Sequence, residues 1–306
     1  MTDMRYDGRV AIITGAGGGL GRSHAMLLAS RGAKVVVNDL GGAVDGTGAS
    51  GGAAQQVVDE IKAAGGEAVA DTHNVASPES ARAIFKTAID AFGKVDILIN
   101  NAGILRDKSF KNMSPELFDP VLDVHLKGTV WVTQAAWEHM RENKYGRIVN
   151  TSSAAGIFGN FGQTNYGAAK MGIVGFTHVL KQEGAKYNIK ANVIAPGAKT
   201  RMTQDLLGPM ASQFDMGPEE VSPVVAYLCH EDCRVNGEIY SAAAGRVGRI
   251  FIGANLGMFK PKHTIEDIRD HWQQIRDTEQ FSIPGSAMEE MSLLMKAKAK
   301  ADKVGA

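Results

Sequence analysis

Tyr166 and Lys170 are the pair of side chains in this sequence best suited to moving a proton. Residues four apart in a helix lie on one face, one turn from each other. A free phenol, with a pKa of about 10, is a weak acid or base at neutral pH. A neighbouring ammonium favours the phenolate and lowers that pKa, and the hydroxyls of residues 151–153 are candidates to steady the reacting oxygen. The same spacing also occurs in ordinary amphipathic helices with a buried Tyr and a solvated Lys, so the rest of the chain decides.

A glycine-rich segment near the N-terminus has the composition of a phosphate-binding loop. Residues 14–21 read Thr-Gly-Ala-Gly-Gly-Gly-Leu-Gly, after an apolar run at residues 10–13 and before a helical pattern through residues 25–29. In this setting the glycines let the backbone approach an anion, whose charge meets the N–H groups at the start of the helix. The pattern predicts a pyrophosphate site that includes Gly15, Gly19, Leu20 and Gly21.

An acidic residue ends the next predicted strand. Residues 34–39 form an apolar strand pattern that closes on Asp39, 18 residues past Gly21. A carboxylate at this place can accept hydrogen bonds from both ribose hydroxyls of NAD, and it repels the 2′-phosphate of NADP. Arg22 is the cation near the loop that could offset this repulsion. The sequence therefore predicts NAD as the cofactor.

Strand-like and helical segments alternate over the first two thirds of the chain. Further strand patterns lie at residues 67–70, 95–99, 147–150 and 191–195, and one long helix is predicted from residue 115 toward residue 141. This alternation predicts an α/β fold with a doubly wound parallel sheet, the Rossmann fold. The candidate residues follow the strands, so one edge of the sheet collects them. Residues 40–52 are too rich in glycine for regular structure, and we expect a mobile loop near the adenosine.

Composition excludes several classes of protein. The 306 residues are 44% apolar and 22% charged, which is typical of a soluble globular protein. Lys plus Arg and Asp plus Glu both number 33, so no net field favours nucleic acid or an anionic membrane. No run of about 18 apolar residues occurs, and a cytoplasmic protein is expected. Cys229 and Cys233 lack a second pair of ligands, so buried thiols are expected and no metal site.

Five motifs in order resemble the short-chain dehydrogenase/reductase family over residues 7–245. They are the glycine loop at residues 14–21, Asn-Asn-Ala-Gly at residues 100–103, Ser153, the Tyr166–Lys170 pair, and Pro196-Gly197 with Thr200. The resemblance implies that Tyr166 is the acid or base at the substrate oxygen and that Ser153 holds this oxygen. It further implies that Lys170 lowers the pKa of Tyr166 and grips the nicotinamide ribose. The implied cofactor contacts beyond the glycine loop and Asp39 are Asn74, Val75, Asn101, Ala102, Gly103, Tyr166, Lys170, Pro196, Gly197 and Thr200.

Two positions depart from the family pattern. His125 stands where the family usually has the Asn of a water-mediated proton relay. A histidine there can hold a water or pass a proton itself, or it can be a core residue of the helix; both interpretations stay open. Asn74 replaces the Asp that contacts adenine in the family, and its amide can still donate or accept a hydrogen bond.

A narrower resemblance covers nearly the whole chain. Residues 38–42, 101–107, 159–163 and 200–203 resemble the (3R)-hydroxyacyl-CoA dehydrogenase units of the peroxisomal multifunctional enzymes of β-oxidation, also called 17β-hydroxysteroid dehydrogenase type 4. The resemblance implies an acyl-CoA substrate. Alternative functions are a hydroxysteroid dehydrogenase, a 3-oxoacyl carrier-protein reductase and, outside enzymes, a nucleotide-sensing regulator.

Residues 246–306 change character and are predicted to form a C-terminal extension of the 1–245 domain. Thr264 and Asp267 stand at capping-box positions of a predicted helix. A later helical stripe is formed by Met288, Met291, Leu294 and Met295. Such a stripe is typical of a core or a subunit contact, and a homodimer or homotetramer is expected. The preceding basic residues, which either meet CoA phosphates or face solvent, are Arg246, Arg249, Lys260 and Lys262.

Overall fold

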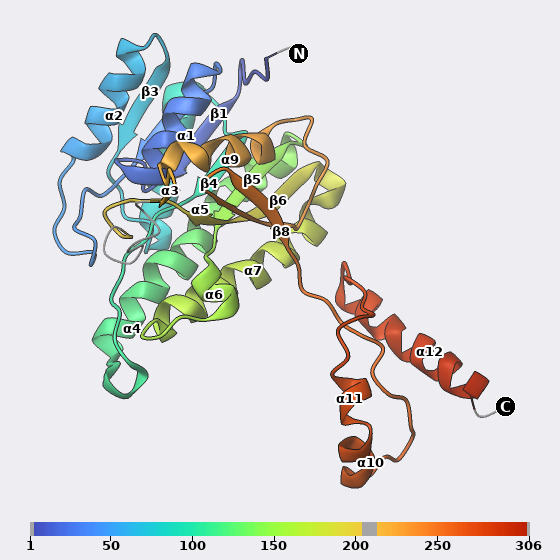
Figure 1. Cartoon of the computed structure of the whole chain (residues 1–306). Coiled ribbons are helices and arrows are strands. Elements are labelled where there is room, and N and C mark those ends of the chain that lie inside the picture. The colour runs from blue at the N-terminus through green and yellow to red at the C-terminus, as the bar shows by residue number, and fades with distance from the viewer. Residues whose placement is uncertain (1–2, 204–212, 305–306) are drawn as a thin grey trace. The chain divides into compact units, whose positions relative to one another are not determined.

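The computed structural model describes residues 3–203 and 213–304 (Figure 1). Contacts between Cα atoms divide the chain into two units, Met1–Arg249 and Ile250–Ala306. None of the helices in the described part of the chain is long and apolar enough to cross a membrane.

The first unit is built on one eight-stranded sheet with the order β3-β2-β1-β4-β5-β6-β7-β8. Neighbouring strands from β3 through β7 are parallel. The six strands predicted from the sequence are present, and two more follow them at the β6 edge. The strands are β1 (Val10–Thr14), β2 (Lys34–Asn38), β3 (Glu67–Asp71), β4 (Ile97–Asn100), β5 (Gly146–Thr151), β6 (Ile189–Gly197), β7 (Ile239–Ala243) and β8 (Arg246–Ile250).

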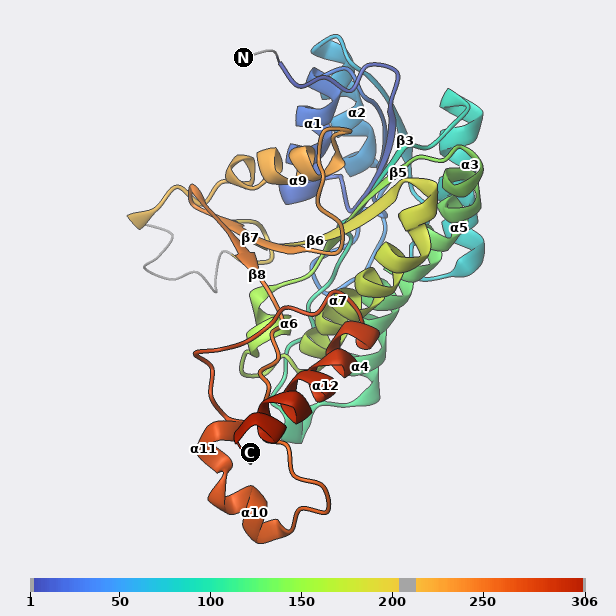
Figure 2. The same cartoon turned by 90° about the vertical axis from the view of Figure 1, so that its right-hand side faces the viewer.

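Helices cover both faces of this sheet, as the predicted Rossmann fold requires (Figure 2). One face packs against α1 (Gly19–Ser30), α2 (Gly52–Ala63) and α9 (Ser222–Cys229), and the other against α3 (Pro78–Phe92), α5 (Gly128–Glu142) and α7 (Thr164–Gly184). All five residues of β1 are buried, because a parallel strand with helices on both faces has no solvent side. Cys229 and Cys233 lie in the core as free thiols.

The prediction of one long helix after residue 115 is wrong, because the helix is interrupted in its middle. The structure has α4 (Pro115–Leu122), a π-helical turn over Asp123–Lys127 and then α5. Pro120 lies inside α4 and has no N–H to donate to the preceding turn. Single π turns inside helices often occur at functional sites, and this one carries His125.

The second unit contains α10 (Ile265–Asp270), α11 (Trp272–Ile275) and α12 (Ala287–Val304). The predicted capping box is confirmed, since Thr264 and Asp267 exchange side chain to backbone hydrogen bonds of 3.3 and 2.9 Å. The predicted apolar stripe lies on α12, where Met288 is 80% and Met295 69% exposed. Within the described residues the stripe is therefore not core, and its role as a subunit contact stays a prediction.

Candidate active site

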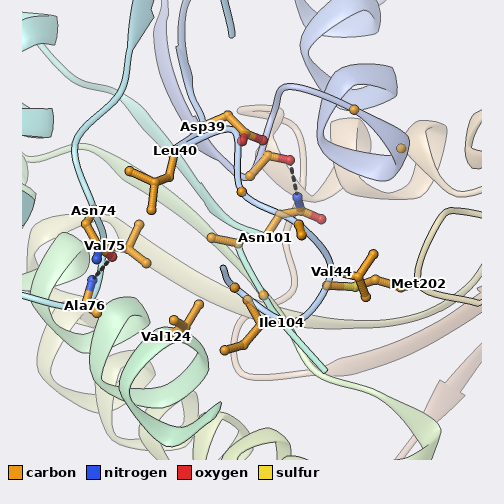
Figure 3. A pocket seen from close by; sticks show the side chains of 18 of the residues that line it. Asp39, Leu40, Val44, Asn74, Val75, Ala76, Asn101, Ile104, Val124 and Met202 are labelled. Carbon is orange, nitrogen blue, oxygen red and sulfur yellow. Dashed lines mark hydrogen bonds between the residues drawn. The ribbon is translucent and has the colours of Figure 1, made fainter. Parts of the chain in front are cut away.

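A pocket of about 380 Å³ follows the carboxyl ends of the central strands (Figure 3). This edge of a doubly wound sheet is where such folds bind ligands. Most of the predicted cofactor residues line the pocket, and Figure 3 shows how the labelled ones point into it. The predicted residues that line it are Gly15, Gly19, Leu20, Asp39, Asn74, Val75, Asn101, Ala102, Gly103 and Thr200.

The glycine loop packs tightly against the end of β4. A Cβ on Gly15 would lie 2.8 Å from Cα of Ala102, and Gly15 has a φ of +63°, which favours glycine. A Cβ on Gly21 would lie 2.2 Å from the carbonyl oxygen of Gly15. Asn101 Nδ2 donates to the carbonyl oxygens of Thr14 and Gly15, both at 3.0 Å. Asn101 thus fixes the loop from the neighbouring strand.

The start of α1 is suited to an anion. Gly18 is the N-cap and provides no side-chain hydrogen bond to the first turn, whose described residues include no acidic side chain. Among the described residues no side chain caps these N–H groups, and Gly19 and Leu20 of this turn line the pocket. Together with the close backbone approach at Gly15, this fits the diphosphate of a dinucleotide.

Asp39 lies beside the loop, as predicted. Its Oδ2 accepts from the N–H of Gly17 at 2.8 Å, and its Oδ1 accepts from the N–H of Gly41 at 2.7 Å. A carboxylate has about four acceptor sites, so both oxygens can still accept from a ribose. Arg22 is bound to Glu60, with Nε 2.7 Å from Oε2. The cation that could have favoured NADP is therefore paired with an acid on α2.

Of four further predicted cofactor residues, two line the pocket and two do not. The side-chain oxygen of Asn74 accepts from the N–H of Ala76 at 2.9 Å, which leaves its amide N–H₂ as a donor (Figure 3). Thr200 Oγ1 accepts from the N–H of Met202 at 3.2 Å. Pro196 and Gly197 close β6 and do not line the pocket. They place the turn that carries Thr200.

The predicted catalytic side chains come together beside the pocket. Ser153 follows β5 and caps α6 (Ala154–Phe158), where its Oγ accepts from the N–H of Ala155 at 3.1 Å. Tyr166 and Lys170 lie on α7, and the Lys170 ammonium is 5.5 Å from the centre of the Tyr166 ring. Burial raises the pKa of Tyr166, the hydrogen bond with Ser153 lowers it, and the charge of Asp107 raises it.

Lys170 is buried and binds the end of β5. Its Nζ donates to the carbonyl oxygen of Thr151 at 2.6 Å. Burial lowers the pKa of Lys170 to about 7, because a buried ammonium loses its hydration. The structure therefore differs from the expectation of a lowered Tyr166 pKa: burial has the largest effect on both groups, and it disfavours both charged forms.

His125 is buried and packs against the ring of Tyr166. The two rings meet edge to face with centroids 5.1 Å apart. Nε2 of His125 is 3.0 Å from the N and 2.8 Å from the O of Ile104, while Nδ1 has no partner among the described residues. Burial, followed by the charge of Lys170, lowers the pKa of His125 well below its usual value. The ring is therefore neutral at pH 7 and holds the loop after β4.

Some pocket residues were not predicted. Residues 41–51 of the glycine-rich segment after β2 contribute four lining residues, and Arg106 and Met202 contribute from two other loops. The sequence marked the segment as irregular and close to the adenosine. It gave no sign of the partner against which the segment packs. The four are Gly42, Ala43, Val44 and Gly46.

A phosphate-binding glycine loop next to a Ser, Tyr and Lys set is the arrangement of a dinucleotide-dependent oxidoreductase. The family model for short chain dehydrogenases matches residues 9–209. The chain belongs to the short-chain dehydrogenase/reductase family. This family uses nicotinamide dinucleotide cofactors, and the chain is an oxidoreductase of that class.

The similarity to known proteins extends beyond the residues that the family model matches. The chain is 47% identical to the peroxisomal multifunctional enzyme type 2 of Mus musculus over 99% of its own length and 41% of that enzyme. It is 52% identical to a short-chain type dehydrogenase/reductase of Mycobacterium tuberculosis, over 90% of this chain and 97% of that protein. The structure of the full-length peroxisomal multifunctional enzyme type 2 from Drosophila melanogaster matches with a TM-score of 0.80 and 41% identity. It covers 97% of this chain, which spans half of that one.

Proposed function

We propose that the chain is an NAD-dependent oxidoreductase that interconverts (3R)-3-hydroxyacyl-CoA and 3-oxoacyl-CoA. The observation that carries the proposal is the reach of the similarity. The family model ends at residue 209, but the match to the mouse multifunctional enzyme includes 99% of the chain, and so the C-terminal extension. Similarity restricted to the Rossmann unit would support a dehydrogenase of any substrate, whereas similarity through the extension supports one substrate class.

In the proposed reaction Tyr166 exchanges a proton with the substrate oxygen. NAD, when bound, supplies the hydride acceptor and, in its oxidised form, a positive charge on the nicotinamide ring. In the oxidation direction the Tyr166 phenolate takes the proton of the 3-hydroxyl group, and in reduction the phenol returns it. Ser153, whose hydroxyl lowers the pKa of Tyr166, turns its one proton to the substrate oxygen and so holds it in place.

The electrostatics around Tyr166 and Lys170 support a role for the charge of the cofactor in this step. Burial disfavours both the Tyr166 phenolate and the Lys170 ammonium. A positive charge added to the site favours the phenolate of Tyr166. Lys170, when protonated, adds to that effect and can donate to a ribose hydroxyl while keeping its bond to Thr151.

The cofactor proposal is NAD rather than NADP. Asp39 lies next to Gly17 of the loop, where a 2′-phosphate would meet its negative charge. The Arg22 cation that could relieve this repulsion is bound to Glu60. The charge of Asp39 and the pairing of Arg22 therefore both favour an unmodified ribose.

We further propose that the chain acts as a homodimer or homotetramer. The exposed methionine and leucine side chains of α12 form an apolar face on the second unit, and such a face is usually covered in the working assembly. The equal numbers of acidic and basic residues favour neither nucleic acid nor an anionic membrane as a partner.

The test is the change in NADH absorbance with a matched set of substrates. Acetoacetyl-CoA and the two enantiomers of 3-hydroxybutyryl-CoA report on the acyl-CoA proposal, and a steroid alcohol and an acetoacetyl carrier protein report on the alternatives. We expect turnover of acetoacetyl-CoA and of the (3R) enantiomer, with the (3S) enantiomer slower by at least about 100-fold. Turnover of the steroid or the carrier protein alone would contradict the proposal.

A further inference from the structure

The glycine-rich insert, residues 41–51, forms one wall of the cofactor pocket and lies against the loop after β4. The N–H of Leu105 donates to the carbonyl oxygen of Val44 at 2.9 Å. A Cβ on Gly46 would lie 3.1 Å from side-chain atoms of Ile104. The insert therefore reaches across from the end of β2 to the end of β4.

Arg106 joins the insert to α4. Its Nε donates to the carbonyl oxygen of Asp45 and its Nη1 to the carbonyl oxygen of Glu116, both at 2.8 Å. In a regular helix the carbonyl of residue 116 would accept from the N–H of residue 120. Residue 120 is a proline and has no N–H. Arg106 thus binds the acceptor that Pro120 leaves free.

The backbone of Arg106 is also bound to the helix that carries Tyr166. Nδ2 of Asn165, a fully buried residue, donates to the carbonyl oxygens of Arg106 and Leu117, both at 2.9 Å. Its Oδ1 accepts from the N–H of Tyr166 at 2.7 Å. Residue 106 therefore contacts the cofactor wall through its side chain and the start of the catalytic helix through its backbone.

We propose that Arg106 is a positioning residue that latches the insert over the bound cofactor, so that cofactor release requires the latch to open. The inference rests on the proposed function only in that the pocket binds a nicotinamide dinucleotide. A glycine-rich segment loses more conformational entropy on ordering than other segments do. Its closed position therefore depends on the few bonds that it makes outside itself.

The latch is made by hydrogen bonds to backbone oxygens, and the charge of Arg106 adds only to the bonds from Thr47 in lowering the pKa of Asp45. The carboxylate of Asp45 accepts from the N–H and the hydroxyl of Thr47 at 3.0 and 2.7 Å, within the insert. Arg106 binds the backbone oxygen of Asp45 instead. The planar guanidinium presents several donors at once, so one side chain can hold the carbonyls of Asp45 and Glu116 together. A lysine ammonium has no such fork.

The test is the rate of NADH release, followed by stopped-flow fluorescence on the full chain. Arg106→Gln removes the fork and the charge, and we expect the dissociation rate constant to rise at least about tenfold, which corresponds to 1.4 kcal/mol, with a smaller change in the association rate constant. Arg106→Lys keeps the charge, but its three donors sit on one nitrogen of a flexible stem rather than on the separate Nε and Nη1 atoms of a planar group, so an intermediate rate is expected. The matched control is Asp45→Asn, which keeps the backbone acceptor; its rate should stay within about twofold of the wild type.

A lower melting temperature of Arg106→Gln with unchanged NADH release would show a purely structural role and overturn the proposal. Equally fast release from Asp45→Asn would show that charge attraction holds the insert, which overturns it as well. If Arg106→Gln does not fold, Arg106→Lys decides by the same rate. The measurement needs no acyl-CoA: a wild type that binds NADH but turns over no acyl-CoA would disprove the proposed substrate and leave the latch intact.

Discussion

Gly103 and His125 are in such close contact that a side chain on the first has no room beside the second. A Cβ on Gly103 would lie 2.2 Å from Cε1 of His125. The His125 ring is held on its other sides by the backbone of Ile104 and by the ring of Tyr166. The loop that lines the cofactor pocket and the candidate catalytic tyrosine are therefore both in contact with one buried imidazole.

This contact predicts the outcome of a double-mutant cycle. Gly103→Ala should lower kcat/KM at least about tenfold, because the new methyl group pushes His125 against Tyr166. His125→Asn, which introduces the usual residue of the family, should be tolerated, since an amide can bond both the N and the O of Ile104. The smaller amide should also rescue Gly103→Ala. Steady-state kinetics and melting temperatures check this; a double variant no better than Gly103→Ala would contradict it.

The sequence predicts those parts of the fold whose determinants are local. Apolar runs specify β1 to β6, and the glycine loop and Asp39 follow them at fixed spacing, so the pocket is predictable. The π turn at His125 is not, because Pro120 indicates an interruption of the helix but not the kind of turn that follows it. The bond from Arg106 to the carbonyl oxygen of Glu116 is not predictable either. This oxygen is a free acceptor only because Pro120 lacks an N–H. Pairings between distant segments leave no local periodicity to detect.

Replacing Tyr166 by Phe tests the proposed proton transfer. The phenylalanine ring keeps the edge-to-face contact with His125 but has no proton to exchange. We expect kcat to fall at least about 100-fold, with the dissociation constant for NADH nearly unchanged. Turnover close to that of the wild type would show that another group moves the proton. Fluorescence titration with NADH supplies the control for folding.

Replacing Lys170 by Met should weaken both turnover and NADH binding, yet stabilise the cofactor-free protein in a pH-dependent way. The folded pKa of Lys170 is about 7, against an ordinary value of 10.5. Between these values the unfolded chain binds a proton that the folded chain does not. Burying Lys170 therefore destabilises the folded wild type increasingly as the pH drops from 10.5 to 7. Below pH 7 this destabilisation is complete and no longer changes with pH.

Met removes that cost and fills a similar volume, although the carbonyl of Thr151 loses its donor. We expect a melting temperature of Lys170→Met above that of the wild type by at least about 3 °C at pH 6, with the difference shrinking toward pH 10. A difference that is constant over this range, or that grows with pH, would refute the lowered pKa of Lys170.

The second unit should matter for assembly or for the substrate rather than for the cofactor. Because β8 belongs to the sheet, the chain should be cut after Ile250 rather than at residue 245. We expect the shortened chain to bind NADH, since every residue that lines the pocket is retained. Its oligomer size or its kcat/KM for acetoacetyl-CoA should fall. Light scattering and kinetics on both chains decide, and a shortened chain unchanged in both respects would contradict the prediction.

Cofactor choice should depend on Asp39. In the proposed function its carboxylate accepts from the adenosine ribose, and charge-assisted hydrogen bonds of this kind contribute up to about 3 kcal/mol each. A 2′-phosphate would lose these bonds and meet a like charge. We expect kcat/KM to favour NAD over NADP at least about tenfold, or 1.4 kcal/mol.

Two variants distinguish the effect of the Asp39 carboxylate on cofactor choice from the effect of the Arg22–Glu60 ion pair. Asp39→Ala should reduce the preference chiefly by weakening NAD, because Arg22 remains bound to Glu60. Asp39→Ala combined with Glu60→Gln should release Arg22 and improve the use of NADP beyond the single variant. Kinetics with both cofactors on one substrate measures each step. Equal efficiency of NAD and NADP in the wild type, or a preference for NADP, would show that Asp39 does not select the cofactor.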